Sequence, residues 1–117
     1  MQVFKEYRFE SAHWLPGVPD GHPCGRMHGH SYRLVVKVDG PLDPTTGWVV
    51  DFATIDAAFL PLHARLDHHL LNEIEGLHNP TCELLAHWIL QRLQPALPNL
   101  SELTLWETAD AGCHLKR

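Results

Sequence analysis

Residues 31–39, with the sequence SYRLVVKVD, constrain the fold more than any other segment of this chain of 117 residues. The even-numbered positions from 32 to 38 are all apolar, whereas most of the odd-numbered positions are polar or charged. Successive side chains of a strand point to opposite faces, so this alternation predicts a strand with one buried face. The sequence GPLDPTTG that follows is typical of a turn and predicts where the strand ends.

Three further segments are also expected to be strands: residues 2–10, residues 102–109 and residues 113–116. Their alternation is less regular than that of residues 31–39, and the last of them adjoins turn residues. Residues 15–25 hold three prolines and three glycines, which predicts a loop after the first strand. The first strand is expected to pair with the strand at residues 31–39 across this loop.

Between the two pairs of strands, the apolar period changes to that of a helix. Apolar residues recur at helical spacing from Phe52 to Leu62, and Pro61 is expected to end or kink that helix. A second helix is expected to begin with Asn79 as its N-cap, followed by a proline, and to run toward Pro95. The order of two strands, two helices and two strands (ββααββ) predicts an α+β fold, with an antiparallel four-stranded sheet and both helices on one face.

The length and charge of the chain exclude several classes of protein. A length of 117 residues is typical of one domain, which we expect to span residues 1–117. The formal charge of −5 argues against nucleic acid or an anionic membrane as a partner. No apolar run reaches the roughly 20 residues of a membrane-spanning helix. The first residues also lack the pattern of a signal peptide, so a cytoplasmic location is expected. Three widely spaced cysteines do not indicate a disulfide framework.

Histidine is unusually abundant, with ten residues, which directs attention to metal and proton-transfer chemistry. His28 and His30 are two positions apart at the start of the best predicted strand, so both imidazoles can point to one ion. His13, which follows the first strand, is the candidate third ligand, because catalytic zinc usually has three protein ligands and one open position. The alternative is that this spacing is a coincidence on an exposed strand.

Cys24 precedes His28 by four residues and allows two interpretations. As a fourth ligand it would close the site, and closed zinc sites are structural. As a free thiol beside a bound cation it would lose its proton more readily, which suits a base or a nucleophile. The spacing alone does not separate these roles.

Two further groups are candidates for proton transfer or ligand binding. Asp67 and His68 are adjacent and can form an acid–histidine pair, although Asp67 could equally cap a turn beside solvated histidines. Glu107 shares a face of its predicted strand with Leu103 and Leu105, and a carboxylate on a buried face needs a partner. That partner could be the N–H groups of a planar heterocycle; the alternative is that the strand ends early and Glu107 is exposed.

Six motifs, in order along nearly the whole chain, resemble one family: FESAHWLP, CGRMHGHSYRL, GWVVDF, LDHHLLN, NPTCE and WETADAGC. They resemble the 6-pyruvoyltetrahydropterin synthase family and, within it, the 6-carboxy-5,6,7,8-tetrahydropterin synthases of queuosine (7-deazaguanine) biosynthesis. The resemblance implies the tunnelling fold (T-fold) and a homo-oligomer, often a hexamer, with active sites between subunits. It also implies a zinc-dependent lyase that converts 7,8-dihydroneopterin triphosphate to 6-carboxy-5,6,7,8-tetrahydropterin, acetaldehyde and triphosphate.

The resemblance assigns roles to the candidate residues. It implies that His13, His28 and His30 bind zinc, and that Cys24 is a catalytic residue beside the metal rather than a ligand. Two alternatives remain: 6-pyruvoyltetrahydropterin synthase activity, which eliminates triphosphate without breaking the carbon chain, and a non-catalytic structural zinc-binding module.

The resemblance also implies that Asp67 and His68 form the catalytic acid–base pair and that Glu107 anchors the pterin. One position departs from the family, because Cys82 stands where members commonly carry Ser or Thr. Thr81 is therefore the hydroxyl expected to contact the substrate there.

Overall fold

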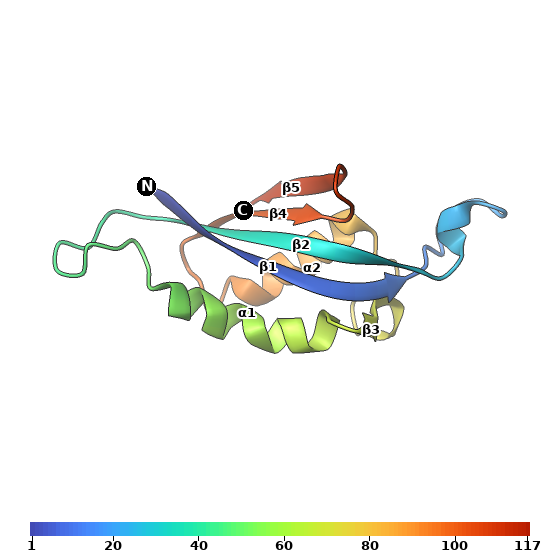
Figure 1. Ribbon diagram of the computed structural model, residues 1–117, viewed down its shortest axis with the longest axis horizontal. Coiled ribbons are helices and arrows are strands. Elements are labelled where there is room, and N and C mark those ends of the chain that lie inside the picture. The colour runs from blue at the N-terminus through green and yellow to red at the C-terminus, as the bar shows by residue number, and fades with distance from the viewer.

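The computed structural model describes all residues, 1–117, as a five-stranded sheet with two helices packed on one face (Figure 1). The strands are β1 (Gln2–His13), β2 (His28–Asp39), β3 (His69–Leu70), β4 (Leu100–Trp106) and β5 (Gly112–Lys116). The helices are α1 (Phe52–Leu66) and α2 (Cys82–Leu93), with two short 3₁₀ turns, η1 (Pro23–Gly25) and η2 (Leu71–Glu73). Neither α1 nor α2 is both long and apolar enough to cross a membrane.

The sheet differs in one respect from the predicted four-stranded antiparallel sheet. Its order is β3-β1-β2-β4-β5, and the additional strand β3 pairs with β1 in parallel, so the sheet is mixed. A parallel neighbour requires a crossover connection, and α1 lies within the connection that leads back to β3. Because β3 has only two residues, its sequence carries no alternation that could have predicted it.

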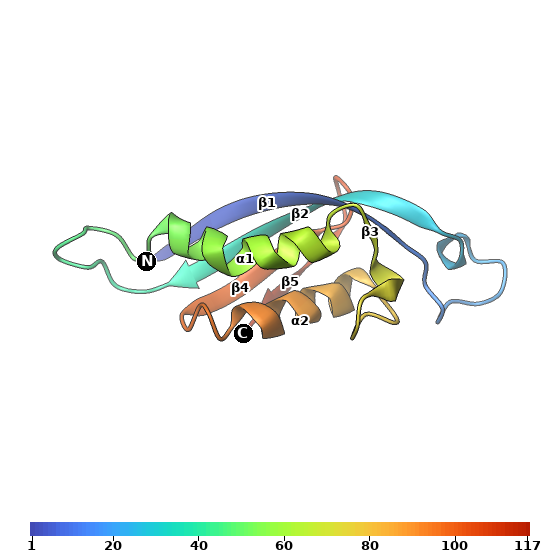
Figure 2. The same ribbon diagram turned by 90° about the horizontal axis from the view of Figure 1, so that it is seen from below.

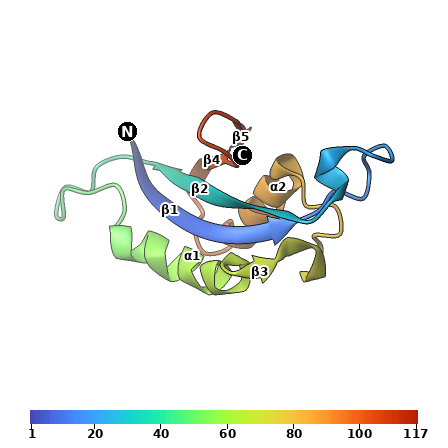
Figure 3. The ribbon, with the colours of Figure 1, turned by 45° about the vertical axis from the view of Figure 1, so that its right-hand side comes forward.

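The long β1–β2 hairpin brings the candidate metal ligands together. Its antiparallel register runs from Gln2 opposite Asp39 to His13 opposite His28. Both strands are longer than predicted, and the added residues include His13, His28 and His30. These histidines therefore lie on regular strands, next to the loop of residues 14–27 that projects beyond the helices (Figure 3).

The core lies between the sheet and the two helices, which run side by side beneath the strands (Figure 2). Phe9 and Tyr32 stack with ring centroids 5.0 Å apart on this face of the sheet. Ile55 of α1 and Ile89 of α2 are fully buried within the same core. The even-numbered side of β2, which the alternation predicted to be buried, faces this core, and the histidines at its start continue the same side.

Helix α1 continues through Pro61, so this proline does not end the helix, which was one of the two predicted outcomes. Proline lacks the N–H that would bond one turn back, which weakens a helix locally. Leu62 and Leu66, which follow Pro61, are both buried, and their burial in the core compensates for the missing hydrogen bond.

The other element boundaries shift by a few residues. Thr81 rather than Asn79 is the N-cap of α2, and its hydroxyl oxygen accepts a hydrogen bond from the N–H of Leu84. Strand β4 ends at Trp106 instead of residue 109, because the N–H groups of Glu107 and Thr108 both donate to the carbonyl of Ala111 in a tight turn.

Candidate metal centre and active site

Three imidazoles converge where β1 ends and β2 begins. One ring nitrogen from each of His13, His28 and His30 lies within 4.8 Å of the other two, and we call this group the histidine triad. His13 is almost completely buried, with 1% of its surface exposed, whereas His28 and His30 are partly exposed. The triad thus has a fixed, buried side and a side open to a ligand.

Backbone carbonyls determine which nitrogen of two triad rings faces inward. Nδ1 of His13 is 2.8 Å from the carbonyl oxygen of Pro80, and Nδ1 of His28 is 2.6 Å from the carbonyl oxygen of Arg26. A carbonyl can only accept, so both Nδ1 atoms carry the hydrogen. In this tautomer the two Nε2 atoms carry lone pairs, and they lie only 3.0 Å apart. Two lone pairs this close repel each other unless a cation lies between them.

The electrostatics of His13 also suit a metal ligand. Burial lowers the pKa of His13, and this effect outweighs the opposing effects of the Pro80 carbonyl and Glu107. The ring is therefore neutral near pH 7, which is the protonation state that binds a metal. Three imidazoles, two of them with Nδ1 held by a backbone carbonyl, match the donor set of catalytic zinc sites.

Cys24 lies beside the triad but outside its donor group. A cavity of about 300 Å³ opens next to the triad, and we call it the triad cavity; it is lined by His13, Leu15, Pro23, Cys24, His28, His30 and Glu107. The group of donor atoms within 4.8 Å of one another does not include the Cys24 thiol. The thiol, which is partly exposed in η1, is thus available to a molecule in the cavity.

Glu107 also faces the triad, although it lies just beyond β4 rather than on it. Its Oε1 atom is 3.6 Å from Nε2 of His13 and 3.9 Å from Nε2 of His30. The strand ends early, as the alternative interpretation held, yet the carboxylate is only 26% exposed and points into the site. From there it can accept hydrogen bonds from a bound heterocycle or contribute negative charge beside a cation.

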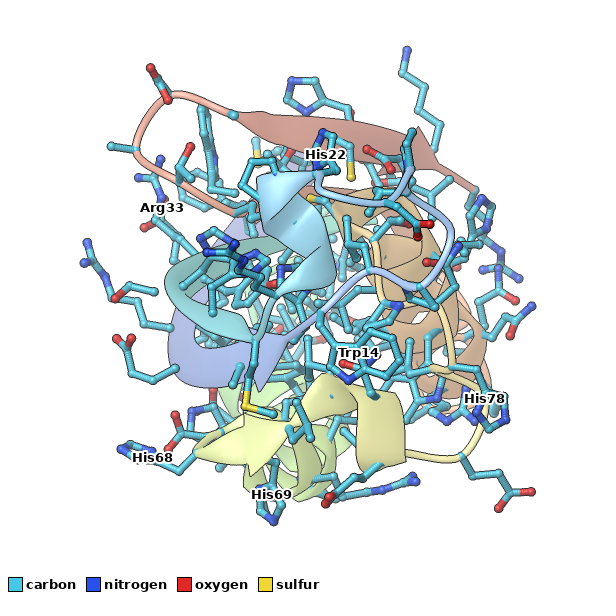
Figure 4. The ribbon with its side chains drawn as sticks, turned by 90° about the vertical axis from the view of Figure 1, so that its right-hand side faces the viewer. Trp14, His22, Arg33, His68, His69 and His78 are labelled. Atoms are coloured by element: carbon cyan, nitrogen blue, oxygen red, sulfur yellow. The ribbon has the colours of Figure 1, made fainter.

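Asp67 and His68 form a pair that does not line the triad cavity. Nδ1 of His68 is 2.9 Å from Oδ2 of Asp67, and the other carboxylate oxygen accepts the N–H of Glu10 at 2.8 Å. These hydrogen bonds, the one from Glu10 first, lower the pKa of Asp67. The His68 side chain is 78% exposed and projects outward (Figure 4). The backbone of His68 has a positive φ of 59°.

Thr81 and Cys82 also lie outside the lining of the triad cavity. The Thr81 hydroxyl oxygen is used as the cap of α2, which leaves its hydrogen free to donate. The Cys82 thiol is buried and faces the carbonyl of Leu105 at 3.6 Å and the thiol of Cys113 at 3.7 Å.

Sequence reasoning missed the carbonyls that orient the triad. Pro80 and Arg26 contribute only a backbone carbonyl, which every residue possesses, so no sequence signal could identify them. Asn72 was noticed only as part of LDHHLLN, yet its side-chain amide bonds to the backbone of Trp14, directly after His13.

Comparisons with known proteins agree with this arrangement. The family model described as 6-pyruvoyl tetrahydropterin synthase matches residues 2–117. A 6-carboxy-5,6,7,8-tetrahydropterin synthase of Synechocystis is 41% identical, over 94% of this chain and 88% of that protein. A dihydroneopterin monophosphate aldolase of Pyrococcus furiosus is 37% identical, over 77% of this chain and 78% of that protein. The solved structure of 6-pyruvoyl tetrahydropterin synthase from Caenorhabditis elegans superposes with a TM-score of 0.92 at 25% identity, covering 100% of this chain and 95% of that one.

Proposed function

Because the chain belongs to the 6-pyruvoyl tetrahydropterin synthase family, we propose that it is a zinc-dependent carbon–carbon lyase of queuosine biosynthesis. The proposed reaction converts 7,8-dihydroneopterin triphosphate and water to 6-carboxy-5,6,7,8-tetrahydropterin, acetaldehyde and triphosphate. The observation that carries this proposal is the meeting of three imidazoles, a thiol and a carboxylate around one cavity. The 41% identity to a protein of the carboxy type favours this product over the pyruvoyl one.

The triad supplies the metal site in this proposal. His13, His28 and His30 would hold zinc, which would supply a Lewis acid that lowers the pKa of a substrate hydroxyl. The carbonyls of Pro80 and Arg26 hold two of the rings in the tautomer that binding requires.

Cys24 is the proposed base. Its thiol borders the triad cavity without belonging to the donor group, so it can take a proton from the substrate side chain in its thiolate form. A closed structural site would need this sulfur among the ligands. Its position outside the donor group therefore favours the enzyme over the non-catalytic zinc module.

Glu107 is the proposed anchor of the pterin. A carboxylate can accept two N–H bonds from the amino-pyrimidine part of the ring, which would orient the substrate in the cavity. Because Glu107 is close to His13 and His30, a pterin anchored by it would present its side chain to the triad.

The Asp67–His68 pair is the proposed proton carrier, but it does not line the triad cavity of its own chain. We therefore propose that it completes the site of a neighbouring copy in a homo-oligomer, such as the hexamer implied by the resemblance. The exposed His68 ring, held by Asp67, is free to reach a second chain.

The test is mass spectrometry of the products formed by zinc-loaded protein from 7,8-dihydroneopterin triphosphate. We expect the mass of 6-carboxy-5,6,7,8-tetrahydropterin together with released acetaldehyde. A 6-pyruvoyl product would establish the second candidate reaction, which the match to the solved 6-pyruvoyl tetrahydropterin synthase supports. Unchanged substrate, with unfolding on chelation, would instead favour a structural zinc module.

A further inference from the structure

Asn72 holds the backbone next to the triad with both ends of its side-chain amide. The N–H of Trp14 donates to Oδ1 of Asn72 at 3.0 Å, and Nδ2 of Asn72 donates to the carbonyl of Trp14 at 2.7 Å. We call these two bonds the Asn72 clamp. They join η2, which follows β3, to the residue directly after His13.

The clamp extends the pairing of β1 with β3 through a side chain instead of the backbone. Ser11 pairs with His69 and Ala12 with Leu70, and Asn72 lies at the same offset of 58 residues from Trp14. The backbone leaves the strand at Leu71 to form η2, so it cannot extend the ladder itself. The side-chain amide of Asn72 offers an N–H donor and a C=O acceptor, as a backbone peptide group does. It therefore substitutes for the backbone pair that would otherwise lie opposite Trp14.

The clamp also holds the segment that carries Cys24. Within the loop of residues 14–27, the N–H of Leu15 donates to the carbonyl of Cys24 at 2.8 Å. The hydrogen bonds that join this loop to the rest of the chain are the two of the Asn72 clamp and the one from the His28 ring to Arg26. Hydrogen bonds thus tie the loop to the fold at two residues, Trp14 and Arg26.

From this geometry we propose that Asn72 is a positioning residue for the active site. It aligns His13 for the metal through the neighbouring peptide and sets Cys24 through the bond between Leu15 and Cys24. This inference rests on the proposed function, because it assumes that the triad binds zinc and that Cys24 acts beside it. It concerns the construction of the site rather than any contact between Asn72 and a substrate.

The experiment compares four substitutions in the full-length chain. Asn72→Ala removes both bonds of the clamp. Asn72→Asp keeps the acceptor but loses the donor and sets a carboxylate oxygen against the Trp14 carbonyl. Asn72→Gln retains both donor and acceptor. Asn99→Ala is the matched control, because that exposed side chain makes no hydrogen bond and lies in the α2–β4 connection.

Three quantities are measured for each variant: the zinc dissociation constant by chelator competition, the alkylation rate of Cys24 in metal-free protein, and hydrogen exchange of the Trp14 amide. We expect Asn72→Ala and Asn72→Asp to weaken zinc binding by about tenfold, the low end of the cost of losing an outer-shell partner, because the clamp reaches His13 only through the neighbouring peptide. Both should also speed alkylation of Cys24 and exchange at Trp14. Asn72→Gln should recover part of each effect, and Asn99→Ala should resemble the parent.

Faster exchange at Trp14 with unchanged zinc affinity and unchanged Cys24 reactivity would overturn the proposal and leave Asn72 a merely structural residue. Equal zinc affinity and equal Cys24 reactivity in the Asp and Gln variants would also overturn it, because the side-chain amide would then not be what positions the site. If the Ala variant fails to fold, the Asp and Gln variants decide. None of these measurements uses a pterin, so a failure of the proposed reaction, seen as no turnover by the parent protein, is distinguishable from a failure of the clamp.

Discussion

His13 and His68 lie near the same end of β1 but in opposite environments. His13 is 1% exposed and its Nδ1 faces the neutral carbonyl of Pro80, whereas the His68 side chain is 78% exposed and its Nδ1 faces the carboxylate of Asp67. Burial lowers the pKa of His13 despite the opposing effect of the Pro80 carbonyl, whereas the His68 ring is exposed and bonded to a carboxylate. Under the proposed function, burial and the partner of Nδ1, rather than the residue type, distinguish the metal ligand His13 from the proton carrier His68.

The sharpest test of this division is the loss of each histidine in turn. His13→Ala removes a triad donor, so we expect zinc affinity to fall by more than the ~100-fold that the loss of an outer-shell partner can cost. His68→Ala should leave the zinc content unchanged, because no hydrogen bond joins the His68 ring to the triad. Metal analysis after gel filtration measures both. Equal zinc loss in the two variants would contradict the different roles proposed for His13 and His68.

Removal of the thiol separates metal binding from chemistry within the triad cavity. Cys24→Ala should reduce turnover by about 10²- to 10⁴-fold, the range for loss of a catalytic acid or base, while zinc remains bound. Steady-state kinetics and metal analysis on the same preparation measure the two quantities. Stoichiometric loss of zinc would restore the interpretation of Cys24 as a ligand.

Mixed oligomers test whether His68 serves another copy. Cys24→Ala and His68→Ala chains should each be nearly inactive alone. After mixing under conditions that allow subunits to exchange, activity should return, because one interface then combines an intact thiol with an intact imidazole. Activity that stays at the level of the separate variants would place both groups in one chain's site and contradict an active site between subunits.

The acid stability of the protein probes the carboxylate partner of His68. The pKa of Asp67 is lowered in the folded state, mainly by the N–H of Glu10 and then by His68. Its stabilising effect is therefore complete above the unfolded pKa of about 3.9 and is lost as the pH falls through the lower folded value. In urea titrations, Asp67→Asn should lose stability relative to the parent above about pH 4, with the difference shrinking at more acidic pH. A difference that does not depend on pH would exclude this cause.

The smallest effect is expected at Cys82. The Ser hydroxyl of Cys82→Ser would face the Leu105 carbonyl, as the thiol does, and would not reach the triad cavity. We expect KM to be unchanged and the free energy of unfolding to change by less than about 1 kcal/mol. A clear decrease in KM would mean that this position contacts the substrate after all.

Local periodicity was enough to predict four strands and two helices, because it depends on side-chain direction along one element. The order of these elements then predicted that both helices share one face. Local periodicity failed where contacts between distant segments determine the ends of a helix. Burial of Leu66 stabilises α1 beyond Pro61. Thr81, rather than Asn79, caps α2, although both are good N-cap residues.

Prediction of the site from the sequence has the same limit. His28 and His30 were recognisable from their spacing on a strand, and the register then brings His13 opposite His28. Glu107 reaches the triad from a turn rather than from the strand that was predicted to present it. The support from Pro80 and Asn72 depends on contacts between segments far apart in the sequence, and no local pattern contains that information.

The left-handed backbone of His68 has an evolutionary consequence. At a φ of 59° a residue with a Cβ atom costs about 1–3 kcal/mol, and glycine would adopt the same conformation without that penalty. Substitution by glycine should therefore raise the melting temperature while deleting the imidazole. A lineage selected for thermal stability alone would drift toward glycine at this position. If His68 carries protons as proposed, stability and activity favour different residues at this position.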